Sequence, residues 1–158
     1  MLKLNLGCAD DLLPDYTNVD REEYPNWAKS ERDCFVWDLG TTWPWQDSVV
    51  DFIRAYDVIE HLPDKILTMN EIWRVLKPGR EVEIFVPTTD GRGAWQDPGH
   101  VSYWNRNSFF YWTVGDPHFE RFKGAYGIKG GFKVTKEARW NDFNADVEKL
   151  QITLEKVA

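Results

Sequence analysis

Two short segments near the start of the chain could hold a nucleoside. Segment 2–6 alternates apolar and polar residues and runs into the small-residue turn 7–11, and a second segment, 16–19, ends in the acid Asp20. A strand that enters a tight turn, followed by a strand that ends in an acid, is typical of the nucleoside-binding end of a Rossmann-like sheet. Gly7 allows close approach to the backbone, and Asp20 can accept hydrogen bonds from both ribose hydroxyls. An ordinary strand–turn–strand with solvated aspartates is the alternative.

The charge of this turn indicates which nucleoside it suits. A dinucleotide site uses three glycines and a helix N-terminus to hold a pyrophosphate. Residues 7–12 contain one glycine and the carboxylates of Asp10 and Asp11, which would repel a diphosphate. They suit a ligand with cationic groups, such as S-adenosylmethionine (SAM) with its sulfonium and ammonium. The segment between Gly7 and Asp20 is too short for a crossover helix of about ten or more residues with its turns, so we expect little more than a turn there.

The segment Leu4-Asn5-Leu6-Gly7-Cys8-Ala9-Asp10 resembles the first motif of the class I SAM-dependent methyltransferases, in particular the small type 11 group. With later motifs, the resemblance covers residues 2–115. It implies an α/β, Rossmann-like methyltransferase fold whose sheet is mostly parallel and has a C-terminal antiparallel strand pair. Ala9 stands where the family usually has a second glycine, and a positive φ costs alanine more than glycine.

The resemblance also implies which residues hold the cofactor. Asp20 matches the ribose-binding acid of the second strand, although it could instead cap a turn. Asp38 and Leu39 match the pair that contacts the adenine, although an aspartate before Gly40 is also a common turn residue. Residues 43–45, Trp-Pro-Trp, either wall the adenine end or anchor their loop by burial. The predicted cofactor-binding residues are Leu6, Gly7, Cys8, Ala9, Asp10, Asp20, Arg21, Asp38, Leu39, Tyr56, Asp57 and His61.

Two histidines are candidate catalytic bases. Segment 56–62 resembles the family motif after the fourth strand, which lines the methionine end of the cofactor. His61 could face the acceptor and act as a base, because its unperturbed pKa is near 6.5; it could equally cap the next helix or form a hydrogen bond inside the core. His100 lies in segment 96–104, which resembles an Asp-Pro-x-His stretch of small relatives where an acceptor would bind. A rigid loop, with His100 satisfying backbone groups, is the alternative.

Several function classes lack the residues they need. Segment 57–60 has no Pro-Pro pair, which argues against methylation of a flipped base. No spacing is typical of a serine–histidine–acid triad or of a metal site, so we predict no metal. Cys8 and Cys34 form no recognisable pattern and are predicted to be buried small hydrophobes; a disulfide between them is the alternative. The net charge of −7 makes nucleic-acid binding unlikely. The bases within 121–139 are either solvated faces or face an anionic partner.

The elements that must position these residues alternate along a chain of 158 residues, which we expect to form one domain, 1–158. Further strands are expected at 33–39, 50–56, 81–86, 132–140 and 147–157, with helices at 24–32, 64–76 and 105–113, a loop-rich region at 88–130 and a turn at 141–144.

No apolar run approaches the roughly twenty residues of a membrane span, and no signal peptide opens the chain, so we expect a cytoplasmic protein. The family's usual N-terminal helices are missing, and a homodimer could cover the exposed face. We expect a methyltransferase with a small-molecule or unassigned acceptor. A non-catalytic SAM-binding or partner subunit is the alternative. A nicotinamide oxidoreductase is opposed by the acidic, glycine-poor turn.

Overall fold

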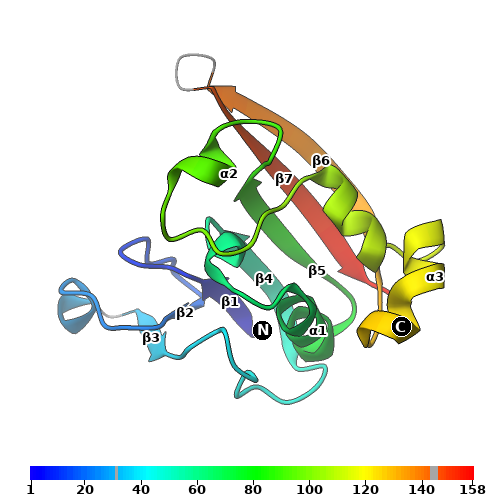
Figure 1. Ribbon diagram of the computed structural model, residues 1–158. Helices are drawn as coiled ribbons and strands as arrows, with labels where there is room; N and C mark the ends of the chain where they lie inside the picture. Colours follow the sequence, from blue (N-terminus) through cyan, green and yellow to red (C-terminus); the bar gives the residue numbers. More distant parts are fainter. Residues whose placement is uncertain (31, 143–145) are drawn as a thin grey trace.

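A seven-stranded sheet dominates the computed structural model, which describes residues 1–30, 32–142 and 146–158 (Figure 1). Within these residues the strand order is β3-β2-β1-β4-β5-β7-β6; the pairs from β3 to β5 are parallel, and β7 runs antiparallel to both of its neighbours, β5 and β6. The predicted mixed α/β fold, with antiparallel C-terminal strands, is confirmed. The strands are β1 (Lys3–Leu6), β2 (Thr17–Asp20), β3 (Asp33–Val36), β4 (Val50–Tyr56), β5 (Leu76–Pro87), β6 (Phe132–Asp142) and β7 (Val147–Lys156).

The helices are few and short. The Asp64 carboxylate accepts hydrogen bonds from the backbone N–H groups of Ile66 and Leu67, both at 2.9 Å, and so begins the longest one. The predicted helix near 105–113 is a 3-10 helix. The α-helices are α1 (Lys65–Val75), α2 (Gly93–Gln96) and α3 (Pro117–Tyr126), and the 3-10 helices are η1 (Trp27–Lys29), η2 (Ile59–His61) and η3 (Arg106–Trp112).

The apolar core lies on one face of the sheet. Residues that are in register across β1, β4, β5 and β7 point to the same face of the sheet. One such row is fully buried and apolar, and it consists of Leu4, Ile53, Val82 and Leu154. Burial of each such side chain stabilises the fold by about 1.5–3 kcal/mol. Figure 1 shows α1 and α2 over one face of the sheet. The next positions along the strands, which point to the opposite face, are polar, as at Arg54 of β4.

The first crossover is built without a helix, as predicted. In the described residues, the connections from β1 to β4 contain no helix apart from η1. Two fully buried asparagines hold the chain after β1 against the sheet instead. Asn5 Nδ2 donates to the carbonyl oxygen of Asp11 at 2.7 Å and to Asn18 Oδ1 at 3.0 Å. Asn18 Oδ1 also accepts from the backbone N–H of Leu13 at 2.8 Å, and Asn18 Nδ2 donates to the Leu13 carbonyl oxygen at 3.1 Å.

Several predicted bounds are corrected. The third strand ends at Val36 rather than 39, because the chain turns at residues 38–41. The predicted helix 24–32 is reduced to η1, and the loop-rich region 88–130 contains the unpredicted α3. The predicted helix 64–76 ends at Val75, and the strand predicted at 81–86 begins directly after it, at Leu76. The predicted turn 141–144 begins within β6, and its residues 143 and 144 lie outside the described part.

Both cysteines are free. Cys8 is buried as predicted, but Cys34 is only half-buried, because it lies on the edge strand β3. The basic side chains of 121–139 are mostly exposed, and Arg139 pairs with Glu148 at 3.0 Å. Over the described residues, no helix has the length and apolarity needed to span a membrane.

Candidate functional site

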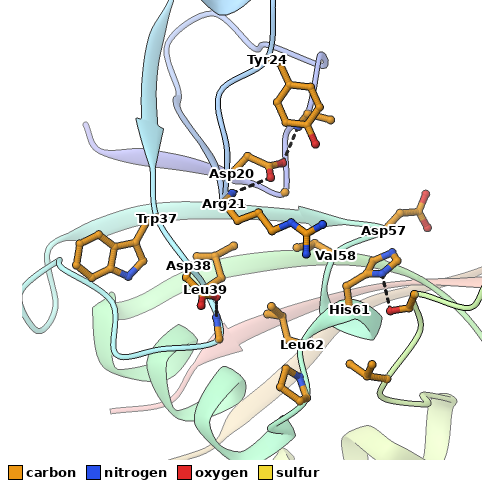
Figure 2. A pocket seen from close by; sticks show the side chains of 16 residues that line it. Asp20, Arg21, Tyr24, Trp37, Asp38, Leu39, Asp57, Val58, His61 and Leu62 are labelled. Atoms are coloured by element: carbon orange, nitrogen blue, oxygen red, sulfur yellow. Dashed lines mark hydrogen bonds between the residues drawn. The ribbon is translucent and has the colours of Figure 1, made fainter.

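A cavity of about 520 Å³ lies at the carboxyl ends of β1, β2 and β4. This is where parallel α/β sheets bind ligands, and the volume suits a small molecule. Figure 2 shows labelled side chains around it. The lining residues are Gly7, Ala9, Asp20, Arg21, Tyr24, Trp37, Asp38, Leu39, Gly40, Asp57, Val58, His61, Leu62, Pro63, Gly99 and Val101.

The turn after β1 approaches the opposite wall closely. Gly7 has a φ of +61°, and a Cβ at this position would lie 2.5 Å from Val58 Cγ2, so both conformation and space demand glycine. Ala9 has a φ of 42°, which confirms that alanine here adopts a positive φ. The Ala9 N–H donates to Asp20 Oδ2 at 2.9 Å, and the Trp27 indole donates to the Ala9 carbonyl oxygen at 2.9 Å. These two bonds offset the strain of the turn.

Asp20 joins the turn to the second strand. Its Oδ1 accepts from the Arg21 N–H at 2.7 Å, while Oδ2 accepts from Ala9 (Figure 2). A carboxylate oxygen has two lone pairs, so each oxygen can accept a further hydrogen bond from a ligand. Asp20 therefore stabilises the turn after β1 and can still accept hydrogen bonds from two hydroxyl groups of a ligand.

The segment after β3 supplies an acid and an aromatic wall. Asp38 is exposed, and its Oδ1 accepts from the Gly40 N–H at 2.8 Å. Trp37 lines the cavity, whereas Trp43 is 3% exposed and donates its indole N–H to the Leu39 carbonyl oxygen at 3.1 Å. Of the two interpretations of the Trp-Pro-Trp segment, loop anchoring by burial is therefore the one that describes Trp43.

The far wall carries an acid and a histidine. Asp57 accepts from Lys149 Nζ at 2.7 and 2.8 Å. The His61 Nδ1 atom lies 2.9 Å from the carbonyl oxygen of Gly99. A carbonyl oxygen only accepts, so Nδ1 carries the hydrogen and Nε2 keeps a free lone pair. His61 is therefore in the tautomer that can take up a proton at Nε2.

A second cavity of about 280 Å³ shares Asp57 and His61 with the first. His100 lines it, with its Nδ1 atom 3.0 Å from the carbonyl oxygen of Ala94. The His61 and His100 rings lie 4.9 Å apart between centroids. Glu60 also lines this cavity, and burial raises the pKa of its carboxyl to about 7. A carboxyl with that pKa exchanges its proton near neutral pH.

The structure brings most of the predicted cofactor-binding residues to the larger cavity. Leu6 and Cys8 are buried and do not line it, Asp10 is exposed outside it, and the Tyr56 hydroxyl is bonded to Glu83. The predicted residues that line it are Gly7, Ala9, Asp20, Arg21, Asp38, Leu39, Asp57 and His61.

The sequence analysis missed other lining residues, among them Tyr24, Trp37, Val58 and Leu62. Val58 and Leu62 lie inside segment 56–62, which the sequence analysis had already connected with the cofactor through its resemblance to a family motif. Tyr24 offered none, because it follows a strand end by several residues in a segment without periodicity.

The acids that face the cavity differ from those on which the charge argument relied. Asp11 pairs with Arg54 at 3.0 Å, and neither it nor Asp10 lines the cavity. The carboxylates that do so are Asp20, Asp38 and Asp57, opposed by the guanidinium of Arg21. The excess of acids that was expected at this end of the sheet is present, but on different residues.

Comparisons with known proteins agree with this geometry. A family model described as a methyltransferase domain matches residues 7–82, just under half of the chain. No curated protein sequence matches the chain. The resemblance to class I SAM-dependent methyltransferases that the motifs predicted is confirmed by this match and by many structural neighbours.

Three solved structures illustrate the likeness. A SAM-dependent methyltransferase from Methanosarcina mazei has a TM-score of 0.64 at 12% identity, covering 99% of this chain and 93% of that one. The Burkholderia thailandensis 1,6-didemethyltoxoflavin-N1-methyltransferase, solved with 1,6-didemethyltoxoflavin and S-adenosylhomocysteine, has a TM-score of 0.66 at 16% identity, covering 99% and 71%. A chain from the complex of the Haloferax volcanii Trm112 methyltransferase activator with a methyltransferase has a TM-score of 0.65 at 14% identity, covering 99% and 83%. At these identities the likeness shows the fold alone.

Proposed function

We propose that this chain, which has the class I methyltransferase fold and a methyltransferase-domain match, transfers a methyl group from SAM to a small-molecule acceptor. The observation that carries the proposal is the larger cavity itself, at the carboxyl ends of the strands, with Asp20, Asp38 and Asp57 on its walls. Three carboxylates against one guanidinium favour a cationic ligand over a dinucleotide.

The residues around this cavity fit the parts of SAM. Asp20 has lone pairs left for ribose hydroxyls, Asp38 can accept from an adenine amine, and Trp37 and Leu39 offer apolar surface to a ring. The 520 Å³ volume falls in the range of cofactor sites. The turn at Gly7 brings the backbone close to Val58, and both residues line the cavity.

SAM supplies an electrophilic methyl group, so the chain's own task is chiefly to hold the acceptor in line with it. The smaller cavity adjoins the larger one at Asp57 and His61 and suits an acceptor. Nε2 of His61 or His100 can take a proton from the acceptor, because each Nδ1 faces a carbonyl oxygen. Near these histidines, Asp57 pairs with Lys149, and the Tyr103 hydroxyl donates to the His100 carbonyl oxygen at 3.3 Å.

A non-catalytic SAM-binding or partner subunit is the second candidate. It is favoured by Ala9, whose positive φ strains the turn where the family usually has glycine, and by the structural neighbour solved with a methyltransferase activator. A homodimer and a cytoplasmic location stay predictions.

Calorimetry with S-adenosylhomocysteine tests the donor site. Wild type should bind it and should not bind NAD, and Asp20→Ala should weaken binding by about 10- to 100-fold, because hydrogen bonds to a charged group contribute about 1.5–3 kcal/mol. Asp10→Ala is the matched control and should change affinity less than about threefold, because Asp10 lies outside the cavity. Equal losses in the two variants, or no binding by wild type, would refute the site.

Transfer of a labelled methyl group to a pool of small molecules separates the two candidates. Labelled product formed by wild type and lost in Asp20→Ala removes the binding-only alternative. Tight S-adenosylhomocysteine binding without labelled product from any acceptor class favours that alternative.

A further inference from the structure

The smaller cavity brings together one carboxylate and two imidazoles from separate parts of the chain. Glu60 and His61 lie in η2, and His100 follows α2. One potential ligand atom from each residue lies within 4.8 Å of the other two. His100 Nε2 is 3.9 Å from Glu60 Oε1 and 3.9 Å from Asp97 Oδ2. These separations are too long for hydrogen bonds, so the side chains lie close together without forming hydrogen bonds to one another.

Glu60 is the least expected member of this group. Its residue is 2% exposed, and its Oε2 atom has no hydrogen-bond partner in the described part of the chain. Its backbone is fixed, because the Glu60 carbonyl oxygen accepts from the N–H groups of Val101 and Ser102 at 2.9 and 3.0 Å. An ionised carboxylate buried without a partner is costly, so the site must supply either a proton or a cation.

The two histidines are oriented alike. His61 Nδ1 faces the Gly99 carbonyl oxygen at 2.9 Å, and His100 Nδ1 faces the Ala94 carbonyl oxygen at 3.0 Å. Each Nδ1 therefore donates its hydrogen, and each Nε2 keeps its lone pair. Metal-binding histidines typically donate their second N–H to a carbonyl or carboxylate in this way, which fixes the tautomer and the ring.

The spacing suits a metal ion. Bonds of about 2.0–2.2 Å from a metal to nitrogen and oxygen place neighbouring ligand atoms roughly 3–4 Å apart. The 3.9 Å separation between His100 Nε2 and Glu60 Oε1 falls in this range, and the ligand atoms of all three residues lie within 4.8 Å of one another. Two imidazoles with one carboxylate favour zinc, iron, cobalt or manganese over magnesium or calcium, which prefer oxygen ligands only.

We propose that Glu60, His61 and His100 bind a divalent first-row transition metal at the wall between the two cavities. The local charge agrees, because Asp57, Glu60 and Asp97 line the smaller cavity together with one ammonium, that of Lys149. This ammonium is already paired with Asp57.

In this arrangement the two histidines are ligands rather than bases. A bound cation would supply Lewis acidity and lower the pKa of an oxygen or nitrogen acceptor at an open position. The metal site does not depend on the proposed methyl transfer, because the ion can be tested without any methyl donor.

Zinc titration of the full chain tests the proposal. Protein stripped with a chelator and dialysed is titrated with Zn²⁺ at pH 7.5, by calorimetry and by competition with a fluorescent zinc indicator. Wild type should bind one Zn²⁺ per chain at micromolar concentration or below. Glu60→Gln and His100→Ala should each weaken binding at least 100-fold, whereas Asp97→Asn should weaken it less.

His118→Ala is the matched control, because His118 is a surface histidine paired with Asp116 at the start of α3. Its Zn²⁺ affinity should equal that of wild type. Titration with Co²⁺ gives a second readout, since its visible absorption bands change with nitrogen coordination and should be lost in His100→Ala. Circular dichroism identifies any variant that fails to fold, and S-adenosylhomocysteine binding in chelator tests the donor site separately.

Three outcomes would overturn the metal site. They are no saturable Zn²⁺ binding by folded wild type, an equal loss of affinity in His118→Ala and His100→Ala, and unchanged affinity in Glu60→Gln. The first would leave Glu60 as a buried acid without a metal partner.

Discussion

The two adjoining cavities are assembled in different ways. The larger one is lined by the turns that directly follow β1, β2 and β4 and by the segment after β3, so each of its acids marks a strand end. The smaller one collects Glu60 from η2, His100 from the connection after β5, and Lys149 from β7. A site made of strand ends leaves a local signature in the sequence, whereas a site made by tertiary packing does not.

The first prediction concerns the tightest point of the larger cavity. Gly7 and Gly79 both have a positive φ, but only at Gly7 would a Cβ collide, 2.5 Å from Val58 Cγ2; at Gly79 no atom lies within 4 Å. Gly79→Ala should lower the free energy of unfolding by about 1–2 kcal/mol, because alanine is strained at a positive φ. Gly7→Ala should add about 1–3 kcal/mol of overpacking. Urea unfolding of the two variants measures the difference.

Equal free energies of unfolding for Gly7→Ala and Gly79→Ala would mean that the contact with Val58 places no demand on the turn. The turn after β1 would then pack less tightly against the residues after β4 than the pairing of these two strands indicates.

The second prediction concerns the buried acid of the smaller cavity. Burial raises the pKa of Glu60 from its ordinary value of 4.5 to about 7; the carboxylates of Asp57 and Asp97 act in the same direction, and Lys149 opposes them. As the pH rises, the unfolded chain loses this proton first. In the presence of a chelator, the free energy of unfolding should therefore fall by roughly 3 kcal/mol between about pH 4.5 and 7. Above pH 7 it should stay at the lower value.

Glu60→Gln should remove this pH dependence and be the more stable protein at pH 8. Chemical denaturation at several pH values, with His118→Ala as the control, measures it. If Glu60→Gln kept the wild-type slope, another group would be responsible.

The smallest effect is expected where the cavities meet. Lys149 bonds Asp57, and both side chains are partly exposed, so Lys149→Gln should change the free energy of unfolding by less than about 1 kcal/mol. It should also leave the Asp57 carboxylate unpaired beside the larger cavity. The affinity for SAM, which is cationic, should then rise about two- to fivefold relative to the affinity for S-adenosylhomocysteine, whose sulfur is uncharged. Calorimetry with both ligands measures this ratio. A fall in this ratio would contradict the charge argument.

Much of the larger cavity could be predicted because its signals are local. Gly7 and Asp20 lie at strand ends that the sequence pattern located, and Asp38 follows the third strand, whose predicted end lay three residues too late. The charge argument named Asp10 and Asp11, because sequence alone does not show that Asp11 pairs with Arg54 from β4.

The smaller cavity and α3 were harder to predict. Glu60 and His61 are adjacent in sequence, but His100 joins them only when segment 96–104 folds back onto η2, so no ligand spacing was visible. Helix α3 had signals at both ends, Asp116-Pro117 and Gly127. Its apolar stripe is too weak to stand out, since Phe119 is its one buried residue.

The asparagine pair has a consequence for how this fold tolerates change. A crossover helix distributes its attachment over many side chains, so the loss of one contact is shared by the rest. Here two amide groups, Asn5 and Asn18, each bonded to the other and to the passing backbone, hold the strand-to-strand link together with the ion pair between Asp11 and Arg54. The backbones of Leu13 and Tyr16, which bond Asn18, lie by the amino ends of β1 and β2, so a longer loop inserted between these two residues would extend at the end of the sheet opposite to the ligand cavity.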